Sequence, residues 1–217
     1  MVVAIDGPAG TGKSSVSSAV AEKTGFSYLN SGKFYRAITW KAYRTGRDLE
    51  RLEDLLEIAR NINIDVRTDA FLVDGEPRDE ELHAPEIDAR VAPVSSFPAI
   101  RSEVNRRLKE IAGNSSVVVE GRDMSTVVFP DAELKIYLDA DPAERARRRY
   151  EQQGSTGDPA ELEKAIRERD ELDRAKETGR LARAEDAIYL DTTHLTLEQV
   201  CEKVIAIIHE QTNSRQE

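Results

Sequence analysis

The fold is decided by the stretch Val-Val-Ala-Ile-Asp-Gly-Pro-Ala-Gly-Thr-Gly-Lys-Ser, residues 2–14. Its first four residues form a short apolar run, and residues 7–14 fit the pattern G-x-x-x-x-G-K-[ST] without exception. A helical pattern with Val16, Ala19 and Val20 on one face follows. Strand, glycine-rich loop and helix in this order are the context of a phosphate-binding loop, which disfavours a chance match or a simple helix-capping turn.

This loop predicts binding of a nucleoside triphosphate. Its glycines let the backbone curl, so that N–H groups point inward at phosphate oxygens. Lys13 is expected to reach the β- and γ-phosphates, and the Ser14 hydroxyl is a candidate Mg²⁺ ligand. The predicted ATP-binding residues span the loop and the start of its helix: Gly7, Pro8, Ala9, Gly10, Thr11, Gly12, Lys13, Ser14 and Ser15.

The composition restricts the partners that the chain can have. The 217 residues carry a net charge of −10, which disfavours nonspecific binding to nucleic acid or to a membrane surface. Yet 22 of the 31 cationic residues are arginines, and nine of these lie between Arg145 and Arg183. Arginines concentrated in this way favour a small phosphorylated ligand. The single cysteine, Cys201, excludes an internal disulfide, and its spacing predicts a core-facing helical residue.

Short apolar strands alternate with helices along the chain, which predicts a three-layer α/β/α sandwich around a parallel sheet. Period-two alternation at residues 62–73, followed by Asp74-Gly75, predicts a small antiparallel hairpin inserted into it. Two arginine-bearing helices flank the break at residues 152–159 and predict a lid. We expect one kinase domain with a core (about 1–30, 99–144 and 184–217), an acceptor-binding arm (31–98) and a lid (145–183).

The arginines outside the loop exceed what one triphosphate needs, so a second phosphate-bearing substrate is expected. Arg145, Arg148 and Arg149 share one helical face and should repel one another unless an anion intervenes. Arg36, near the start of its helix, is also expected to attract an anion. Glu-Gly-Arg-Asp at residues 120–123 follows an apolar strand, where open α/β sheets bind ligands.

For two of these groups of residues, a purely structural role is the alternative to ligand binding. Arg122 and Asp123 could form a structural salt bridge with each other. Arg169, Asp173 and Lys176 lie on one helical stripe, and a solvated face with helix ion pairs would have the same pattern.

Several motifs together resemble the bacterial cytidylate kinases, in the P-loop nucleoside monophosphate kinase family. They are GPAGTGKS (7–14), NSGKFYR (30–36), EGRDMSTVVFPDA (120–132), LDA (138–140) and ERARRR (144–149). The resemblance covers essentially the whole chain, including the hairpin insert. It implies transfer of a phosphoryl group from ATP to CMP or dCMP with Mg²⁺, in pyrimidine nucleotide metabolism.

The resemblance also implies a role for each matched residue. Ser31, Arg36, Arg122 and Lys176 would hold the CMP phosphate, with Tyr35 beside them; Arg169 and Asp173 would face the ribose, and Arg101 and Asp123 the base. Arg145 and Arg149 would bind ATP from the lid, and the implied catalytic set is Lys13, Arg122, Arg149 and Arg169. A carboxylate can accept from the cytosine amino group, which uracil lacks, while arginine donates to O2 or N3.

Some positions depart from the family pattern. Asn30 stands where aspartate is usual, Ser125 where glycine is usual, and Lys176 where arginine is common. A serine that contacts the base in relatives aligns with Ala92, with Ser95 as its alternative. These departures bear on base selectivity more than on kinase activity.

Two rival functions stay open at this point. One is a P-loop kinase of another small acceptor, such as UMP, shikimate or gluconate, and the Gly-Arg-Asp segment and hairpin insert argue against it. The other is a nucleotide-operated switch, but the guanine-reading Asn-Lys-x-Asp motif is absent. With no apolar run long enough for a membrane span and no signal-peptide pattern, we expect a cytoplasmic monomer.

Overall fold

The computed structural model describes residues 1–67, 70–113, 115–152, 154 and 158–213. Its contacts divide into two compact units: the first unit contains Met1–Phe26 and Ser115–Glu217, and the second unit contains Ser27–Asn114. Of the predicted break between the arginine-bearing helices, residues 153 and 155–157 lie outside the described residues. The finer division into core, arm and lid stays a prediction.

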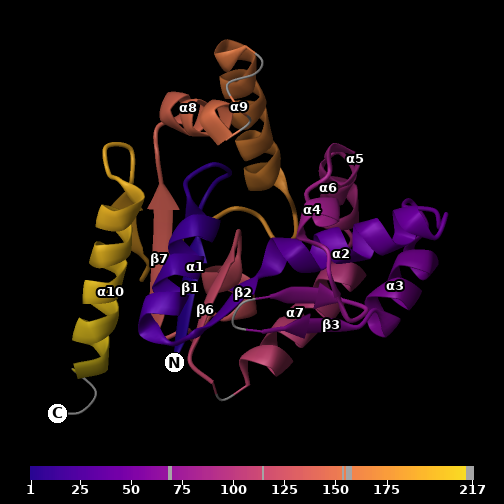
Figure 1. The fold of residues 1–217 in the computed structure, drawn as a ribbon, viewed down its shortest axis with the longest axis horizontal. Helices are drawn as coiled ribbons and strands as arrows, with labels where there is room; N and C mark the ends of the chain where they lie inside the picture. The colour runs from indigo at the N-terminus through magenta and orange to yellow at the C-terminus, as the bar shows by residue number, and fades with distance from the viewer. Residues whose placement is uncertain (68–69, 114, 153, 155–157, 214–217) are drawn as a thin grey trace. The chain divides into compact units, whose positions relative to one another are not determined.

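The first unit is built on a parallel sheet with helices packed against it (Figure 1). Its strands lie in the order β6 (Val117–Gly121), β1 (Val2–Asp6), β7 (Leu134–Asp139) and β8 (Ile188–Asp191). In the register, Val3 lies opposite Val118 of β6 and Leu134 of β7. Residues 3–5 and 117–119 are fully buried, which explains their uninterrupted apolar sequence. The predicted α/β fold with a parallel sheet is confirmed.

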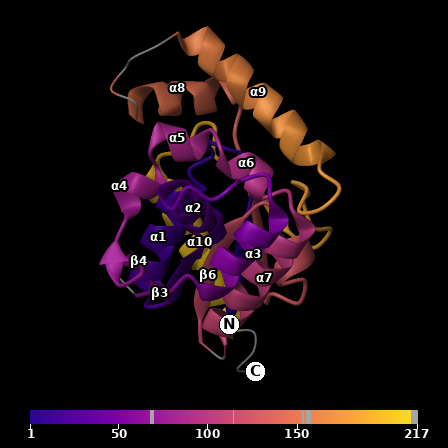
Figure 2. The ribbon, with the colours of Figure 1, turned by 90° about the vertical axis from the view of Figure 1, so that its right-hand side faces the viewer.

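The first unit also contains the α-helices α1 (Lys13–Thr24), α8 (Pro142–Gln152), α9 (Pro159–Ala175) and α10 (Leu197–Asn213). Helix α1 packs against β6 and α10, and the buried face of α10 includes Cys201, as its spacing predicted. Helices α8 and α9 pack against each other, and both views show them side by side (Figure 2). A single π-helical turn, η1 (Met124–Val128), follows β6 and packs against β1.

The second unit is mostly helical. It contains β2 (Ser27–Asn30), α2 (Ser31–Arg44), α3 (Leu52–Asn61), α4 (Asp79–Leu82), α5 (Pro85–Asp88), α6 (Val91–Val94) and α7 (Pro98–Ala112). The Asn30 side chain caps α2 by accepting a hydrogen bond from the Lys33 backbone N–H. Phe34 of α2 meets Phe71 edge to face in the core of this unit, with ring centroids 5.4 Å apart.

The predicted insert is a small antiparallel sheet in the second unit. Strands β3 (Ile64–Val66) and β4 (Phe71–Val73) pair as expected, with Ile64 opposite Val73. A third strand, β5 (Glu76–Pro77), pairs with β4 after the turn at Asp74 and Gly75, so the hairpin extends to three strands. Both turn residues have positive φ, which Asp and Gly tolerate best.

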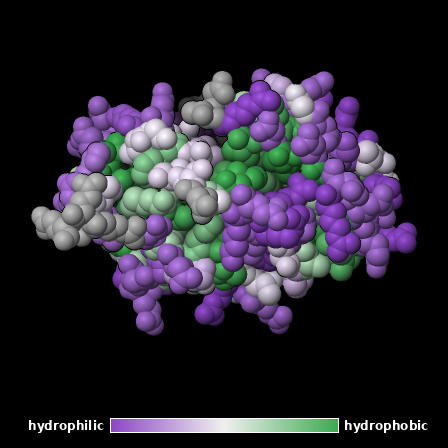
Figure 3. Space-filling model, turned by 90° about the horizontal axis from the view of Figure 1, so that it is seen from below, coloured by the Kyte–Doolittle hydropathy of each residue, from purple (hydrophilic) through white to green (hydrophobic). Residues whose placement is uncertain are grey.

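Polar side chains dominate the one face of the surface that Figure 3 draws. The face drawn in Figure 3 is mostly hydrophilic, with separate hydrophobic patches between the charged residues. None of the described helices combines the length and the apolar character that crossing a bilayer requires.

Candidate active site

The glycine-rich loop after β1 has a backbone that side chains would not permit. Gly7 has a φ of +151°, and a Cβ atom built on it would lie 2.0 Å from the Leu138 carbonyl oxygen. Gly12 has a φ of +88° and caps the N-terminus of α1. The loop therefore passes directly over the end of β7 and delivers the unpaired N–H groups of the first turn of α1. Ser14 and Ser15 in this turn are exposed.

Lys13 lies under the loop. Its ammonium Nζ is 2.5 Å from the Pro8 carbonyl oxygen and 3.5 Å from Thr11 Oγ1, and the side chain is buried. Thr11 Oγ1 donates in turn to the Pro8 carbonyl, 3.2 Å away. These contacts hold the lysine within the curve of residues 8–13 rather than in solvent. A phosphate bound by the loop would meet this ammonium.

Positive charge is concentrated around Lys13. Burial lowers the pKa of Lys13 well below its ordinary value, and the charges of Arg122 and Arg169 lower it further, while Glu120 and Asp6 oppose them. Crowded cations repel one another, so an anion placed among them relieves an existing electrostatic cost. The positive charge of this site therefore favours binding of a polyanion.

Asp6 anchors the segment that carries Arg122 and Asp123. The Asp6 carboxylate accepts hydrogen bonds from the backbone N–H groups of Met124 (2.9 Å) and Ser125 (2.7 Å), and from Ser125 Oγ (2.5 Å). Burial raises the pKa of Asp6 above its ordinary value, although the Ser125 and Met124 hydrogen bonds oppose the shift. These bonds fix the start of η1 at the carboxyl edge of the sheet, and π-helical turns are frequent at functional sites.

Arg122 pairs with Asp173 rather than with its neighbour Asp123. Its Nε lies 3.0 Å from Asp173 Oδ2, and Lys176 Nζ lies 2.8 Å from Asp173 Oδ1. Burial alone would raise the pKa of Asp173, but Arg122 and Lys176 hold it below its ordinary value. Lys176 follows the last residue of α9, so the predicted helical stripe ends at Asp173. Arg169 lies exposed on α9.

The arginines of α8 find anions within the protein, because carboxylates pair with two of the three that were expected to repel one another. Arg145 is buried against Asp170 of α9, and Arg148 pairs with Glu144, 2.9 Å away. The hydrogen bond from Arg147, with help from Arg148, lowers the pKa of Glu144 to about 2. Within the described residues, the Arg149 guanidinium has neither a hydrogen-bond partner nor an ion-pair partner.

A cavity of about 750 Å³ adjoins the loop in the first unit. It is lined by Thr11, Gly12 and Ser15, by residues 192–197, and by polar side chains of α8. Arg148 closes one wall by donating to Thr192 Oγ1 (3.1 Å) and to the Thr192 carbonyl (2.6 Å). Its volume is suitable for a nucleoside.

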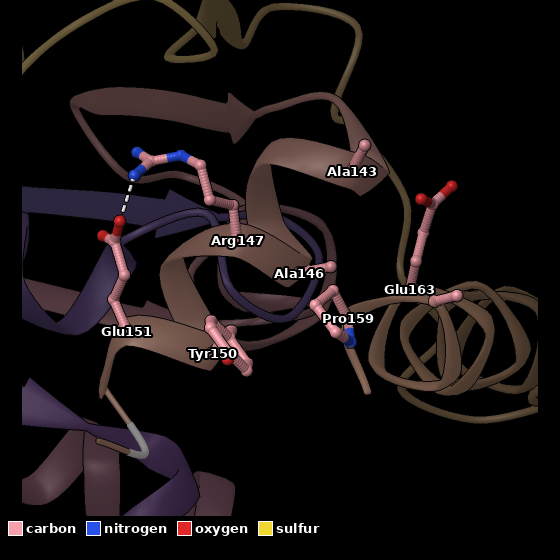
Figure 4. Close-up of a pocket in the computed structure, with 8 residues that line it drawn as sticks. Ala143, Ala146, Arg147, Tyr150, Glu151, Pro159 and Glu163 are labelled. Carbon is pink, nitrogen blue, oxygen red and sulfur yellow. Dashed lines mark hydrogen bonds and ion pairs between the residues drawn. The ribbon is translucent and has the colours of Figure 1, made fainter. Parts of the chain in front are cut away.

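A second cavity, of about 580 Å³, lies between α8 and α9 (Figure 4). Ala146, Tyr150 and Pro159 line it, and the ion pair of Arg147 with Glu151 lies at its side. No residue of the glycine-rich loop is among its lining residues, so it is separate from the phosphate site.

The second unit holds its own cluster of predicted residues. Arg101 is buried, its guanidinium lies 5.5 Å from the centre of the Tyr35 ring, and its Nη1 donates to the Ser95 carbonyl, 3.2 Å away. Ser95 Oγ itself donates to the Ala92 carbonyl, 2.9 Å away. Ser31, also buried, begins α2.

Arg36, in the same unit, is already paired with a carboxylate. It lies in the second turn of α2, not the first, and binds Asp88 and the Leu82 carbonyl. The expectation of an anion at Arg36 is therefore met by a side chain of the protein.

Reasoning from the sequence missed three residues that shape this site: Asp6, Asp170 and Thr192. Asp6 could have been found from the sequence, because a carboxylate at the end of an apolar strand is buried unless the chain turns away, and a buried carboxylate needs partners. Asp170 and Thr192 act on partners that are distant in sequence, and no local pattern marks them.

The chain is similar to a known protein family and to known members of it. The family model described as Cytidylate kinase matches residues 3–210. A cytidylate kinase of Caldanaerobacter subterraneus subsp. tengcongensis is 42% identical over 213 residues, covering 97% of this chain and 95% of the relative. A cytidylate kinase of Oceanobacillus iheyensis is 40% identical over 212 residues, with 94% and 92% covered.

Among solved structures, the chain resembles that of an uncharacterized protein from Eubacterium ventriosum, with a TM-score of 0.55 and 14% identity. The match covers 97% of this chain and 98% of the other, and it supports the fold alone. The two relatives span nearly the whole chain, and the family model includes every element of the site described above. The chain is a kinase of the cytidylate kinase family.

Proposed function

We propose that this enzyme transfers the γ-phosphoryl group of ATP to CMP or dCMP, giving ADP and CDP or dCDP. The observation that carries the proposal is the buried Lys13 under a phosphate-binding loop, crowded by Arg122 and Arg169 in the same unit. Membership of the cytidylate kinase family over residues 3–210 supports the choice of acceptor.

ATP is proposed to bind with its triphosphate on residues 7–15. The cavity of about 750 Å³ begins at Thr11, Gly12 and Ser15, so it would receive the nucleoside end of the same molecule. Arg149, without a protein partner among the described residues, would neutralise phosphate charge from α8.

The residues present suit a magnesium ion bound mainly through the nucleotide. Mg²⁺ keeps several waters and is usually held by one or two protein oxygens together with substrate phosphates. The exposed hydroxyl of Ser14, in the first turn of α1, would be that protein ligand. When bound, the ion would neutralise charge on the β- and γ-phosphates.

The acceptor phosphate is proposed to bind at Arg122 and Lys176. Both cations now share the Asp173 carboxylate, and a dianionic phosphate would compete for them with greater charge. Asp173 and Arg169, on α9, would then face the ribose. Ser31, Tyr35 and Arg36 of the second unit are proposed to contact the same CMP molecule, a part of the proposal that rests on family membership.

Base selection is assigned to Asp123 and Arg101. A carboxylate accepts from the N4 amino group of cytosine, which uracil replaces with an oxygen, and a guanidinium donates to O2 or N3. Both side chains are buried, and buried polar groups that lose their partner are costly, so they discriminate strongly.

The chemistry needs positioning and charge neutralisation more than proton transfer. An acceptor phosphate is already ionised near neutral pH, so no general base is required. Lys13 and the arginines stabilise the charge that spreads over the transferred phosphoryl oxygens in the transition state. The proposed enzyme acts as a monomer in the cytoplasm, on small-molecule nucleotides, and without nucleic acid or membrane partners.

Acceptor preference tests the proposal directly. With ATP and Mg²⁺, ADP release is expected to be rapid with CMP and dCMP and at least about tenfold slower with UMP or AMP. A coupled ADP assay with the four monophosphates at equal concentration measures this. Rapid turnover with UMP, or none with any nucleotide, would contradict CMP as the acceptor, and turnover without any acceptor would indicate a hydrolytic switch.

Asp123→Ala is expected to damage CMP use while sparing ATP binding. The loss of a buried base contact should raise the KM for CMP by roughly 10–100-fold, because such contacts contribute about 1–3 kcal/mol. Calorimetric titration with ATP should give a Kd within a factor of about two of the unmodified enzyme. An equal loss in ATP affinity and CMP turnover would mean that Asp123 does not read the base.

A further inference from the structure

Arg145 is placed unlike the other arginines of α8. Its side chain is only 2% exposed, and its Nη2 lies 2.7 Å from Oδ2 of Asp170, which is 3% exposed. An ion pair removed from water on both sides is expensive to build and is not needed simply to pack two helices. The pair therefore calls for an explanation beyond the contact of α8 with α9.

The other two nitrogens of the guanidinium, Nε and Nη1, donate hydrogen bonds to backbone carbonyls. Arg145 Nε donates to the Ala140 carbonyl at the end of β7, 3.0 Å away, and Nη1 donates to the Ala9 carbonyl of the glycine-rich loop, also 3.0 Å away. One side chain thus joins a strand end, the loop and, through Asp170, helix α9. Each nitrogen of the guanidinium has a protein partner.

The bond to Ala9 fixes the direction of a loop N–H group. In a planar trans peptide the C=O and the following N–H point in opposite directions. Because the Ala9 carbonyl points at Arg145, the N–H of Gly10, an exposed residue, points away from Arg145. Arg145 therefore selects which side of the loop presents a donor to phosphate.

The loop residue beside this bond is fitted to the arginine. Gly10 has a φ of +80°, and a Cβ atom built on it would lie 3.2 Å from Arg145 Cβ. The absence of a side chain at Gly10 lets the stem of Arg145 pass close to the loop and reach Ala9.

We propose that Arg145, held by Asp170, is a positioning residue that orients the Ala9–Gly10 peptide for the phosphates of ATP and does not itself touch the nucleotide. The inference deepens the ATP binding of the proposed function and rests on it. It replaces the expectation that Arg145 grips ATP from the lid, because its nitrogens are already bonded to protein atoms. Asp170 extends the same support to α9, which also carries Arg169 and Asp173.

A purely structural ion pair is the competing explanation, and stability alone does not separate the two. Removing one partner of a buried pair destabilises a protein, whereas a hydrophobic pair of similar volume often restores the lost stability. Only the positioning role requires a donor to the Ala9 carbonyl. The two explanations therefore differ in the double variant Arg145→Met/Asp170→Leu.

The experiment measures the Kd of ATP by calorimetry, without acceptor, together with Tm. The variants are Arg145→Met, Arg145→Lys, the double variant, and Arg167→Met as a matched control, since Arg167 forms an exposed pair with Glu163 on α9. Arg145→Met is expected to weaken ATP binding about tenfold, the effect of one charge-assisted hydrogen bond. Arg145→Lys should weaken it less, because a lysine carries the charge but does not reach three partners together.

The double variant Arg145→Met/Asp170→Leu distinguishes the positioning role from a purely structural ion pair. It is expected to recover the Tm of the Arg167→Met control while its ATP binding stays about tenfold weak. Recovery of both Tm and ATP affinity would overturn the positioning role, as would an Arg145→Met variant that is destabilised but binds ATP with unchanged Kd. Because the readout is ATP binding, these outcomes apply even if CMP is not the acceptor.

Discussion

Replacement of Lys13 by alanine is expected to lower kcat by about 10²–10³-fold, the effect of removing one preorganised donor from the charge that develops in a transition state. The ammonium is buried and lies 2.5 Å from the Pro8 carbonyl, and alanine has no donor to replace it. A coupled ADP assay with saturating ATP, Mg²⁺ and CMP measures the change. Lys23→Ala, on the exposed face of the same helix, is the matched control and should leave kcat unchanged.

The same replacement should not destabilise the fold. Burial and nearby cations lower the pKa of Lys13, which means that the protonated ammonium costs folding free energy at neutral pH. The Tm of Lys13→Ala is therefore expected to equal or exceed that of the unmodified protein. A variant that keeps kcat within tenfold would show that the loop does not hold the transferred phosphate, and a large fall in Tm would show that Lys13 supports the fold.

Arg122→Met should lower kcat/KM for CMP by about 10²–10³-fold, with a much smaller change in the KM for ATP. Arg122 is proposed to bind the phosphoryl acceptor, and arginines that neutralise charge in phosphoryl transfer have effects of this size or larger. Initial rates over a grid of ATP and CMP concentrations separate the two substrates. Arg122→Lys should recover only part of the loss, because lysine lacks the forked geometry of the guanidinium.

A second variant, at the ion-pair partner Asp173, tests the proposed role of Arg122. Asp173→Asn removes the charge that Arg122 and Lys176 now share and keeps the shape of the side chain. It should raise the KM for CMP and leave ATP binding intact, while Arg167→Met should leave both unchanged. Loss of ATP affinity in Arg122→Met equal to the loss of CMP use would place Arg122 on the donor side.

Sequence patterns predicted the helices, strands and turns that are determined by residues close together in the chain. The strand at residues 134–139 has the predicted bounds, and the strand, loop and helix at residues 2–24 lie as expected. Asn30 is of a residue type that favours helix N-caps, and it does cap α2. In each case the signal comes from apolar periodicity or from backbone requirements within a few residues.

The partners of the arginines were not predictable in the same way. Arg145 finds Asp170 on another helix, and Arg36 finds Asp88, which lies 52 positions further along the chain. The charge pattern showed that these arginines need anions, but it gave no means of choosing between a ligand and a distant carboxylate. The predicted roles of these side chains in binding nucleotides stay predictions.

The bounds of the shortest elements were also beyond sequence patterns. Helices α4, α5 and α6 have four residues each, which is too short to show a helical period. The π-helical turn η1 depends on the Asp6 carboxylate, 118 positions away from Met124, and not on local preference. Such features arise from tertiary contacts, which override weak local propensities.

The central position of β1 in the sheet means that this strand cannot pair until much later parts of the chain have been synthesised. Residues 2–6 are translated long before the strands that pair with them, which come from residues 117–121 and 134–139. At about 5–20 residues per second, the first strand waits on the order of ten seconds for its neighbours. A nascent chain that stops before Leu134 also lacks the Leu138 backbone over which the glycine loop folds, so nucleotide binding is acquired only late in synthesis.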